Sequence, residues 1–196
     1  MQHYELARGR PLRYLKGTTN HGIVFQAGPL DAWKLSGAAD SDLAGDLNSG
    51  RSTSGYCFKL GKFRTIVANS KLERKISTST GQAKTYAMAS LIKDLIWARH
   101  LLRELKHAQT EPTTALTDID GVLKQSTKAI NHTTAKHYRI DQAYIRSHYD
   151  SAVTVCGVDT SKNCADMFTK ALHAAPFIRH RAETMGPQVA DHVASK

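Results

Sequence analysis

Three strand-like runs and a fourth candidate precede the first long helix of this sequence, and this order constrains the fold more than any other feature. The runs cover residues 21–25, 33–38, 54–60 and 63–68, and turn residues separate them, with Gly61-Lys62 between the last two. Consecutive strands usually pair with their neighbours. We therefore expect an antiparallel meander.

The second half of the chain alternates between strands and helices. Residues 80–107 carry apolar side chains at helical spacing, from Met88 through Leu95 to Leu105, and predict a long helix. The segments after it are a strand at 113–117, helices at 121–127 and 140–148, a strand at 152–158 and a helical run at 165–172. A meander followed by this alternation predicts an α/β fold, in which helices flank a mixed sheet.

The two ends of the sequence differ from this middle part. Residues 1–20 form a short lead with little core of its own, and it closes at Gly17-Thr18 as a helix does. From His173 the pattern dissolves into Ala, Pro and His, so we expect residues 173–196 to be a loosely ordered tail. The main domain is then expected to span residues 21–172.

The composition favours an anionic partner inside a cell. Lys and Arg number 27 against 17 Asp and Glu, which gives a formal net charge of +10. Such a charge favours nucleic acid, although a merely solvated basic surface gives the same count. The three cysteines are too few and scattered for a disulfide framework, and we expect small packed side chains in a reducing compartment. We see no membrane-spanning or secretory segment and expect the cytoplasm or nucleus.

Three aspartates occupy positions where catalytic carboxylates converge in mixed sheets. Asp40 follows the expected strand at 33–38, Asp118 follows the strand at 113–117, and Asp166 begins the last helical run. Carboxylates at neighbouring strand ends can bind two divalent metal ions, which activate water for phosphodiester hydrolysis. The alternative is that these residues are ordinary helix caps and turn residues.

Several strings between Arg10 and Leu172 decide between these readings. They include Leu12-Arg13-Tyr14-Leu15-Lys16-Gly17-Thr18, Asp40-Ser41-Asp42-Leu43-Ala44-Gly45-Asp46, Arg51-Ser52-Thr53-Ser54-Gly55-Tyr56 and Ala165-Asp166-Met167-Phe168-Thr169-Lys170-Ala171-Leu172. In order and spacing this sequence resembles the ribonuclease H domain of copia-type retrotransposon Pol polyproteins. The resemblance implies a ribonuclease H fold with a mixed five-stranded sheet, and it makes residues 1–20 a remnant of the connection to the reverse transcriptase. The chain would be a truncated copy.

The resemblance also implies a catalytic site with one ligand changed. In this family three Asp and one Glu bind two Mg²⁺ ions and cleave the RNA of RNA–DNA hybrids. The aspartates fall on Asp40, Asp118 and Asp166, but the family's Ser-Thr-x-Glu-Ala-Glu-Tyr string is replaced by Ser79-Thr80-Gly81-Gln82-Ala83-Lys84-Thr85. The metal-binding glutamate is therefore Lys84 here.

Helical spacing indicates where Lys84 points. It lies four residues before Met88 and eleven before Leu95, on the inward stripe of the helix. We expect its ammonium to pair with Asp40 or Asp118 and to take the place of a metal, so that Mg²⁺ is weakly bound or absent and catalysis is lost. Binding of nucleic acid through the basic surface could survive. The alternatives are a side chain turned to solvent, or an active nuclease in which Asp42 or Asp46 replaces the lost ligand.

A third hypothesis rests on Arg10, Leu12 and Arg13. These residues fit the Arg-x-Leu-Arg motif of secreted effectors from oomycete plant pathogens, although chance matches to so short a motif are frequent. In that case a transposon fragment would have been recruited for secretion into a host cell, where it would act on host proteins.

Overall fold

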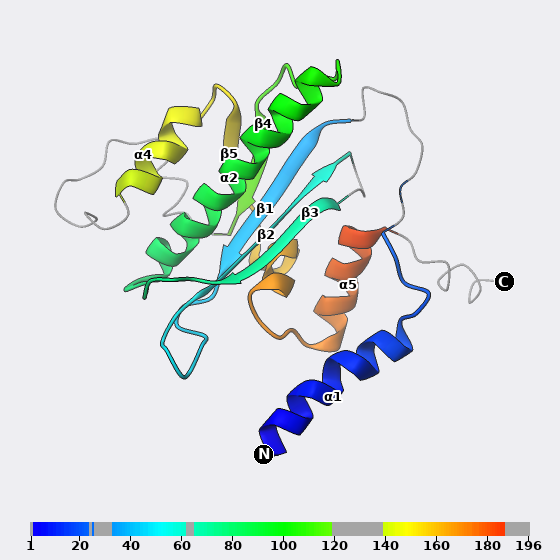
Figure 1. Cartoon of the computed structure of the whole chain (residues 1–196). Coiled ribbons are helices and arrows are strands. Elements are labelled where there is room, and N and C mark those ends of the chain that lie inside the picture. Colours follow the sequence, from blue (N-terminus) through cyan, green and yellow to red (C-terminus); the bar gives the residue numbers. More distant parts are fainter. Residues whose placement is uncertain (1, 24, 26–32, 62–64, 119–138, 187–196) are drawn as a thin grey trace.

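The structure is a computed structural model, and it describes residues 2–23, 25, 33–61, 65–118 and 139–186. Its described residues form one five-stranded sheet with helices on both faces (Figure 1). The strands are β1 Leu35–Ser41, β2 Thr53–Leu60, β3 Thr65–Leu72, β4 Thr113–Thr117 and β5 Val153–Gly157. This is the α/β class that the order of the elements predicts.

The sheet is mixed, with strand order β3-β2-β1-β4-β5. The meander β1, β2 and β3 is antiparallel, while β4 pairs in parallel with β1 on one side and β5 on the other. Asp40 therefore stands in the central strand, opposite Gly55 of β2, and not beyond the end of the strand as we expected. Asp118 directly follows β4, as predicted.

Helix α2, Thr80–Glu104, covers one face of the sheet together with α4, Arg139–His148 (Figure 1). The hydroxyl of Ser79 caps the start of α2 by accepting a hydrogen bond from the backbone N–H of Gln82. The predicted stripe forms the core, since Met88 and Leu95 are fully buried against strand residues such as Phe58. Helix α2 thus runs across β1 with its N-terminal turns near the carboxyl end of that strand.

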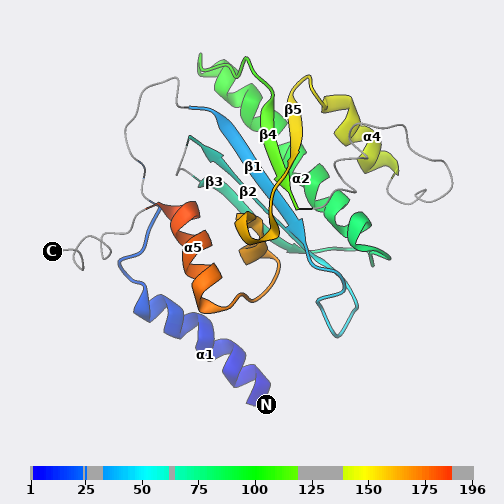
Figure 2. The same cartoon turned by 180° about the vertical axis from the view of Figure 1, so that it is seen from behind.

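The other face of the sheet carries smaller elements (Figure 2). The 3₁₀ helix η3 spans Thr160–Lys162, the 3₁₀ helix η4 spans Cys164–Phe168, and α5 spans Ala174–Met185. The half-buried ion pair between Lys59 of β2 and Glu183 of α5, 2.9 Å long, holds α5 to the sheet. Gly55 allows η4 to approach, because a Cβ there would lie 2.8 Å from the Cβ of Phe168.

Helix α1, Gln2–Gly17, is the N-terminal lead and lies beside α5 in both views. Its Tyr14 ring packs edge-on against Phe177 of α5, with 5.9 Å between the ring centroids. The predicted close of this helix at Gly17 is confirmed. Arg10, Leu12 and Arg13 are all exposed on it.

Three sequence predictions need correction, and a fourth lies outside the described residues. The expected strand at 21–25 is wrong, since the described residues of that segment have no regular structure. The expected loose tail from residue 173 is wrong over Ala174–Met185, because α5 buries His180 and Thr184. The helical run at 165–172 is a short 3₁₀ helix ending at Phe168, and the helix expected at 121–127 lies outside the described residues.

The close approach of η4 makes Gly55 a sensitive position. We expect Gly55→Ala to lower the free energy of unfolding by about 1–3 kcal/mol, because the new methyl group overlaps Phe168 and Thr169. Urea unfolding measures this change. The control is Gly81→Ala in α2, where a Cβ meets nothing within 4 Å and the better helix propensity of Ala should stabilise the protein. Equal effects of both variants would contradict the packing argument.

Candidate active site

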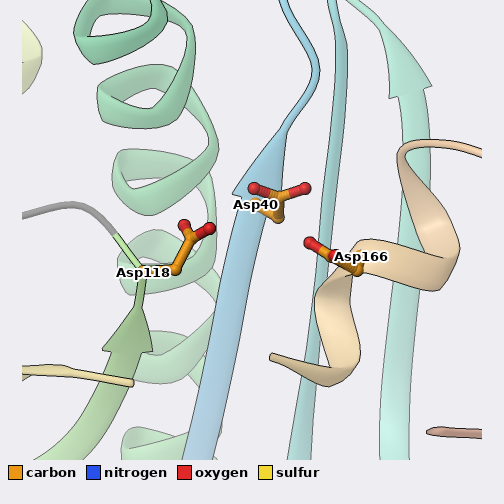
Figure 3. Close-up of side chains that lie close together, drawn as sticks. All are labelled: Asp40, Asp118 and Asp166. Atoms are coloured by element: carbon orange, nitrogen blue, oxygen red, sulfur yellow. The ribbon is translucent and has the colours of Figure 1, made fainter. Parts of the chain in front are cut away.

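Three carboxylates from three separate segments meet at one end of the sheet. Asp40 comes from β1, Asp118 from the end of β4 and Asp166 from η4, and their side chains point toward one another (Figure 3). One oxygen of each lies within 4.8 Å of the others. Asp40 and Asp166 are buried, with 1% and 5% of their surface exposed. The predicted convergence of the three aspartates is confirmed as geometry.

Lys84 reaches into this carboxylate cluster from the first turns of α2. Its Nζ lies 2.9 Å from Oδ1 of Asp40 and 2.5 Å from Oδ1 of Asp118. The side chain is 11% exposed, so the alternative of a lysine turned to solvent is wrong. The sequence predicted a partner in one of these aspartates, and the ammonium bridges both.

Lys170 is a second cation at the cluster, and sequence reasoning missed it. Its Nζ lies 2.9 Å from Oδ2 of Asp166 and 3.9 Å from Oδ2 of Asp40. The signal was present, because a Lys four residues after an Asp can fold back onto that carboxylate. Lys170 is 44% exposed, and so its ion pair borders on solvent.

Two threonine hydroxyl groups complete the surroundings of the carboxylates. Thr169 is buried and donates a hydrogen bond of 2.7 Å to Oδ2 of Asp40. Thr160 of η3 donates one of 3.1 Å to Oδ2 of Asp118. Neither threonine stood out in the sequence, because their role depends on a fold that brings η3 and η4 back to the sheet.

The ionisable groups of the cluster differ in the direction in which their pKa values are shifted. Burial alone would raise the pKa of Asp40, but the hydrogen bond from Thr169 and the charge of Lys84 bring the pKa below its ordinary value. Burial raises the pKa of Asp166 to about 6, against the opposing contact with Lys170 and with the help of the neighbouring Asp40. Burial likewise would lower the pKa of Lys84, yet its contacts with Asp118 and Asp40 raise it. Lys84 is therefore a permanent cation inside the site.

These residues do not fit a pair of Mg²⁺ ions as they are arranged. Carboxylates are suitable ligands, but a charged lysine offers no lone pair and occupies the space between Asp40 and Asp118. Five of the six carboxylate oxygens contact Lys84, Lys170 or a threonine hydroxyl, and only Oδ1 of Asp166 has no hydrogen-bond partner or ion pair among the described residues. A divalent ion would have to displace the ammonium first.

The acids that we considered as replacements for the lost ligand lie elsewhere. Oδ1 of Asp42 accepts a 2.5 Å hydrogen bond from the backbone N–H of Thr53, and Asp46 accepts one from the hydroxyl of Ser49. Both carboxylates organise the connection between β1 and β2. Within the described part of the chain, neither belongs to the group of acids that could share a metal ion.

Comparisons with known proteins agree with this geometry. The chain is 34% identical over 169 residues to a retrovirus-related Pol polyprotein from transposon RE1 of Arabidopsis thaliana, and 32% identical over 163 residues to that of transposon TNT 1-94 of Nicotiana tabacum. These matches cover 86% and 82% of this chain. The chain spans only 11% and 12% of the length of these two relatives. No protein-family model matches it.

Solved structures give the fold. The N-terminal ribonuclease H domain of a Mycobacterium tuberculosis protein has a TM-score of 0.52 at 14% identity, covering 69% of this chain and 90% of that one. The foamy viral protease-reverse transcriptase has a TM-score of 0.53 at 12% identity, covering 74% of this chain and 21% of that one. The chain has a ribonuclease H-like fold, and over most of its length it is similar to one segment of retrotransposon Pol polyproteins. The fold predicted from its sequence strings is confirmed.

The ribonuclease H-like domain also resembles a smaller protein. A stretch of 98 residues is 37% identical to secreted RxLR effector protein 161 of Plasmopara viticola, covering 50% of this chain and 66% of that protein. This match is partial, and it is weaker than the matches to the Pol polyproteins.

Without the Lys84 ammonium, the carboxylates of the cluster should repel one another and destabilise the fold. We expect Lys84→Met to lower the free energy of unfolding by about 3–5 kcal/mol at pH 7, because it leaves buried carboxylates unpaired. The deficit should shrink as the pH falls toward 4. The hydrogen bond from Thr169 and the contacts with Lys84 together lower the pKa of Asp40, so loss of Lys84 raises that pKa and Asp40 takes up a proton more easily in the variant. Urea unfolding at both pH values measures the change.

A surface lysine provides the matched control for this measurement. Lys93 is 54% exposed and pairs with Asp141 at 3.4 Å, so we expect Lys93→Met to cost less than about 1 kcal/mol at either pH. A Lys84→Met protein as stable as Lys93→Met at pH 7 would show that the cluster does not need its internal cation.

Proposed function

We propose that this chain is a ribonuclease H-like domain that has lost hybrid cleavage and retains metal-independent binding of nucleic acid. The observation that carries the proposal is the ammonium of Lys84, which bridges Asp40 and Asp118 at distances of 2.9 and 2.5 Å. It supplies in covalent form the positive charge that Mg²⁺ would supply, but it cannot activate water or stabilise a leaving oxygen as a metal ion does.

Loss of catalysis follows from ligand chemistry. Phosphodiester hydrolysis by two metal ions needs oxygen ligands for both ions and an open position for the attacking water. Here the carboxylates of the cluster are already paired with lysine ammonium groups. The fourth ligand position, where the family has a glutamate, would be occupied by the cation Lys84. Magnesium binding would therefore be weak or absent. Any residual rate of cleavage would be lower by orders of magnitude than that of a ribonuclease H site with all four carboxylate ligands.

Nucleic-acid binding is supported by charge beside the site. The chain carries a formal net charge of +10. Exposed basic side chains stand near the end of β3, at Lys71, and between β3 and α2, at Arg74 and Lys75. Lys170, which contacts Asp166, is exposed as well. The hydroxyl of Ser70 donates a 2.6 Å hydrogen bond to the carbonyl of Phe168, so the segment before Lys71 touches η4. The foamy viral neighbour was solved with an RNA/DNA hybrid, and a hybrid is the partner we propose.

The first experiment tests catalysis. We expect the natural chain to leave a labelled RNA–DNA hybrid intact in Mg²⁺ or Mn²⁺, while Lys84→Glu gains metal-dependent cleavage or, at the least, a rise in Tm on addition of Mg²⁺. Lys84→Gln serves as the control, because it removes the charge without supplying a carboxylate. Clear metal-dependent cleavage by the natural chain would overturn the proposal that its site is inactive.

The second experiment tests binding. We expect the affinity for the hybrid to fall with rising salt and to be unchanged by EDTA, because phosphate contacts and not metal ions hold it. Replacing Lys71, Arg74 and Lys75 together by Ala should reduce the slope of log K against log salt by roughly two to three.

A second triple variant gives a charge-matched control for binding. Replacement of Arg10, Arg13 and Lys16 on α1 removes the same net charge from another surface and should leave the salt slope nearly unchanged. A flat salt dependence of the natural chain, or equal losses in the two triple variants, would contradict an interface beside the carboxylate cluster.

A second candidate function is that of a secreted effector acting on host proteins. It is favoured by the 37% identity to the effector of Plasmopara viticola and by the exposure of Arg10, Leu12 and Arg13 on α1. In this proposal the outer surface would act, and the carboxylate cluster would serve stability alone. We rank it second because the similarity covers 50% of the chain.

The location proposed with the first function is the cytoplasm or nucleus. Within the described ranges, no helix has the length and apolar character to cross a membrane.

A further inference from the structure

Two cysteines far apart in the sequence face each other beneath the carboxylate cluster. Cys57 lies in β2 and Cys164 begins η4, 107 positions later, and their Sγ atoms are 3.3 Å apart. Both are buried, with 0% and 4% of their surface exposed, and both are free thiols. Neither takes part in the carboxylate cluster or in the proposed nucleic-acid interface.

The backbone around this pair is held on both sides. Cys57 packs in a small apolar cluster with Ala38, Cys164 and Ala165, and this cluster joins the central strands to η4. Gly55 lies two residues before Cys57, on the same face of β2, and its lack of a Cβ allows η4 to come close. The amide group of Asn163, adjacent to Cys164, donates a 3.2 Å hydrogen bond to the carbonyl of Ala39. The short distance between the sulfurs is thus built into the packing.

Only a small movement separates the two sulfur atoms from bonding distance. A disulfide has a bond length of about 2.05 Å, so atoms now 3.3 Å apart must approach by about 1.2 Å. The pair differs in this respect from Cys156 of β5, which is half-buried and has no sulfur partner among the described residues.

We propose that Cys57 and Cys164 form a reversible disulfide when the protein meets a peroxide. One thiolate attacks the peroxide, the O–O bond breaks, and a sulfenic acid forms with release of hydroxide. The second thiol then attacks that sulfur and displaces water. Overall the two thiols lose two protons and two electrons, and hydrogen peroxide takes them up to become two molecules of water. Reduction by an external thiol restores the pair.

The bond would act on the neighbouring site as well as on stability. Cys164 lies two residues before Asp166, so the disulfide would tie the segment carrying that carboxylate to β2. It would also close a loop of more than a hundred residues, which restricts the unfolded chain strongly. Because both sulfurs are buried, the reaction would need local opening of η4, and it would be slow in the folded protein.

The experiment treats the full natural chain with hydrogen peroxide, then unfolds it in the presence of iodoacetamide without a reductant. Mass spectrometry should show one alkylated cysteine, Cys156, and a peptide pair joined through Cys57 and Cys164 that lacks two hydrogen atoms. The Tm should rise by roughly 5–10 °C and return on treatment with dithiothreitol. Cys156→Ala is the matched control and should give the same linked peptides and the same reversible rise in Tm, with no alkylated cysteine.

Variants of the pair separate the disulfide from general oxidation. Cys57→Ala and Cys164→Ala should each lose the rise in Tm and the linked peptides. Three alkylated cysteines after oxidation, a linkage that includes Cys156, or added oxygen on Cys164 without a link would each overturn the proposal. Peptide mapping of the natural chain decides the matter even if one variant fails to fold.

Discussion

Carboxylates buried near one another repel, and this fold places three of them at the end of its central strands. The interaction on which the arrangement depends is the pair of contacts from Lys84 to Asp40 and Asp118, assisted by Lys170 on Asp166. The ammonium joins α2, β1 and the end of β4, which are the elements that a ribonuclease H fold must bring together. Without a cation in that position, the desolvated charges would oppose the packing around them.

In the proposed function, Lys84 satisfies the electrostatic requirement of this site and takes the place of the ion that would do its chemistry. A metal ion and an ammonium both neutralise carboxylates, but only the metal can bind water and a phosphate oxygen in its open positions. The carboxylates beside Lys84 are also held by Thr169 and Thr160, since each hydroxyl donates a hydrogen bond to a carboxylate oxygen. The site is therefore ordered and its charges are balanced without a bound ion among the described residues.

Much of the fold and of the candidate site could be predicted from the sequence, because the signals that identify them are local. The apolar stripe of α2 placed Lys84 on the inward face, and the motif strings identified the fold and the three aspartates. The features that were predicted wrongly or missed depend on tertiary contacts between distant parts of the chain. Helix α5 buries the polar residues His180 and Thr184 and exposes Ile178, so its apolar residues do not mark the buried face. The Lys59–Glu183 ion pair helps to hold it in place. The Cys57–Cys164 contact joins residues 107 positions apart, and no local pattern reports such a pair.

The order of the strands also sets the order in which this site can be built. Strands β1 to β3 and helix α2 are contiguous in sequence, so Asp40 and Lys84 are both present before β4, with Asp118 after it, has been synthesised. A growing chain can therefore neutralise its most buried carboxylate from within its first half, whereas a metal site would have to wait for Asp118 and Asp166 to complete its ligands. With a lysine at residue 84, the counter-ion of Asp40 thus belongs to the same contiguous half of the chain as the carboxylate itself.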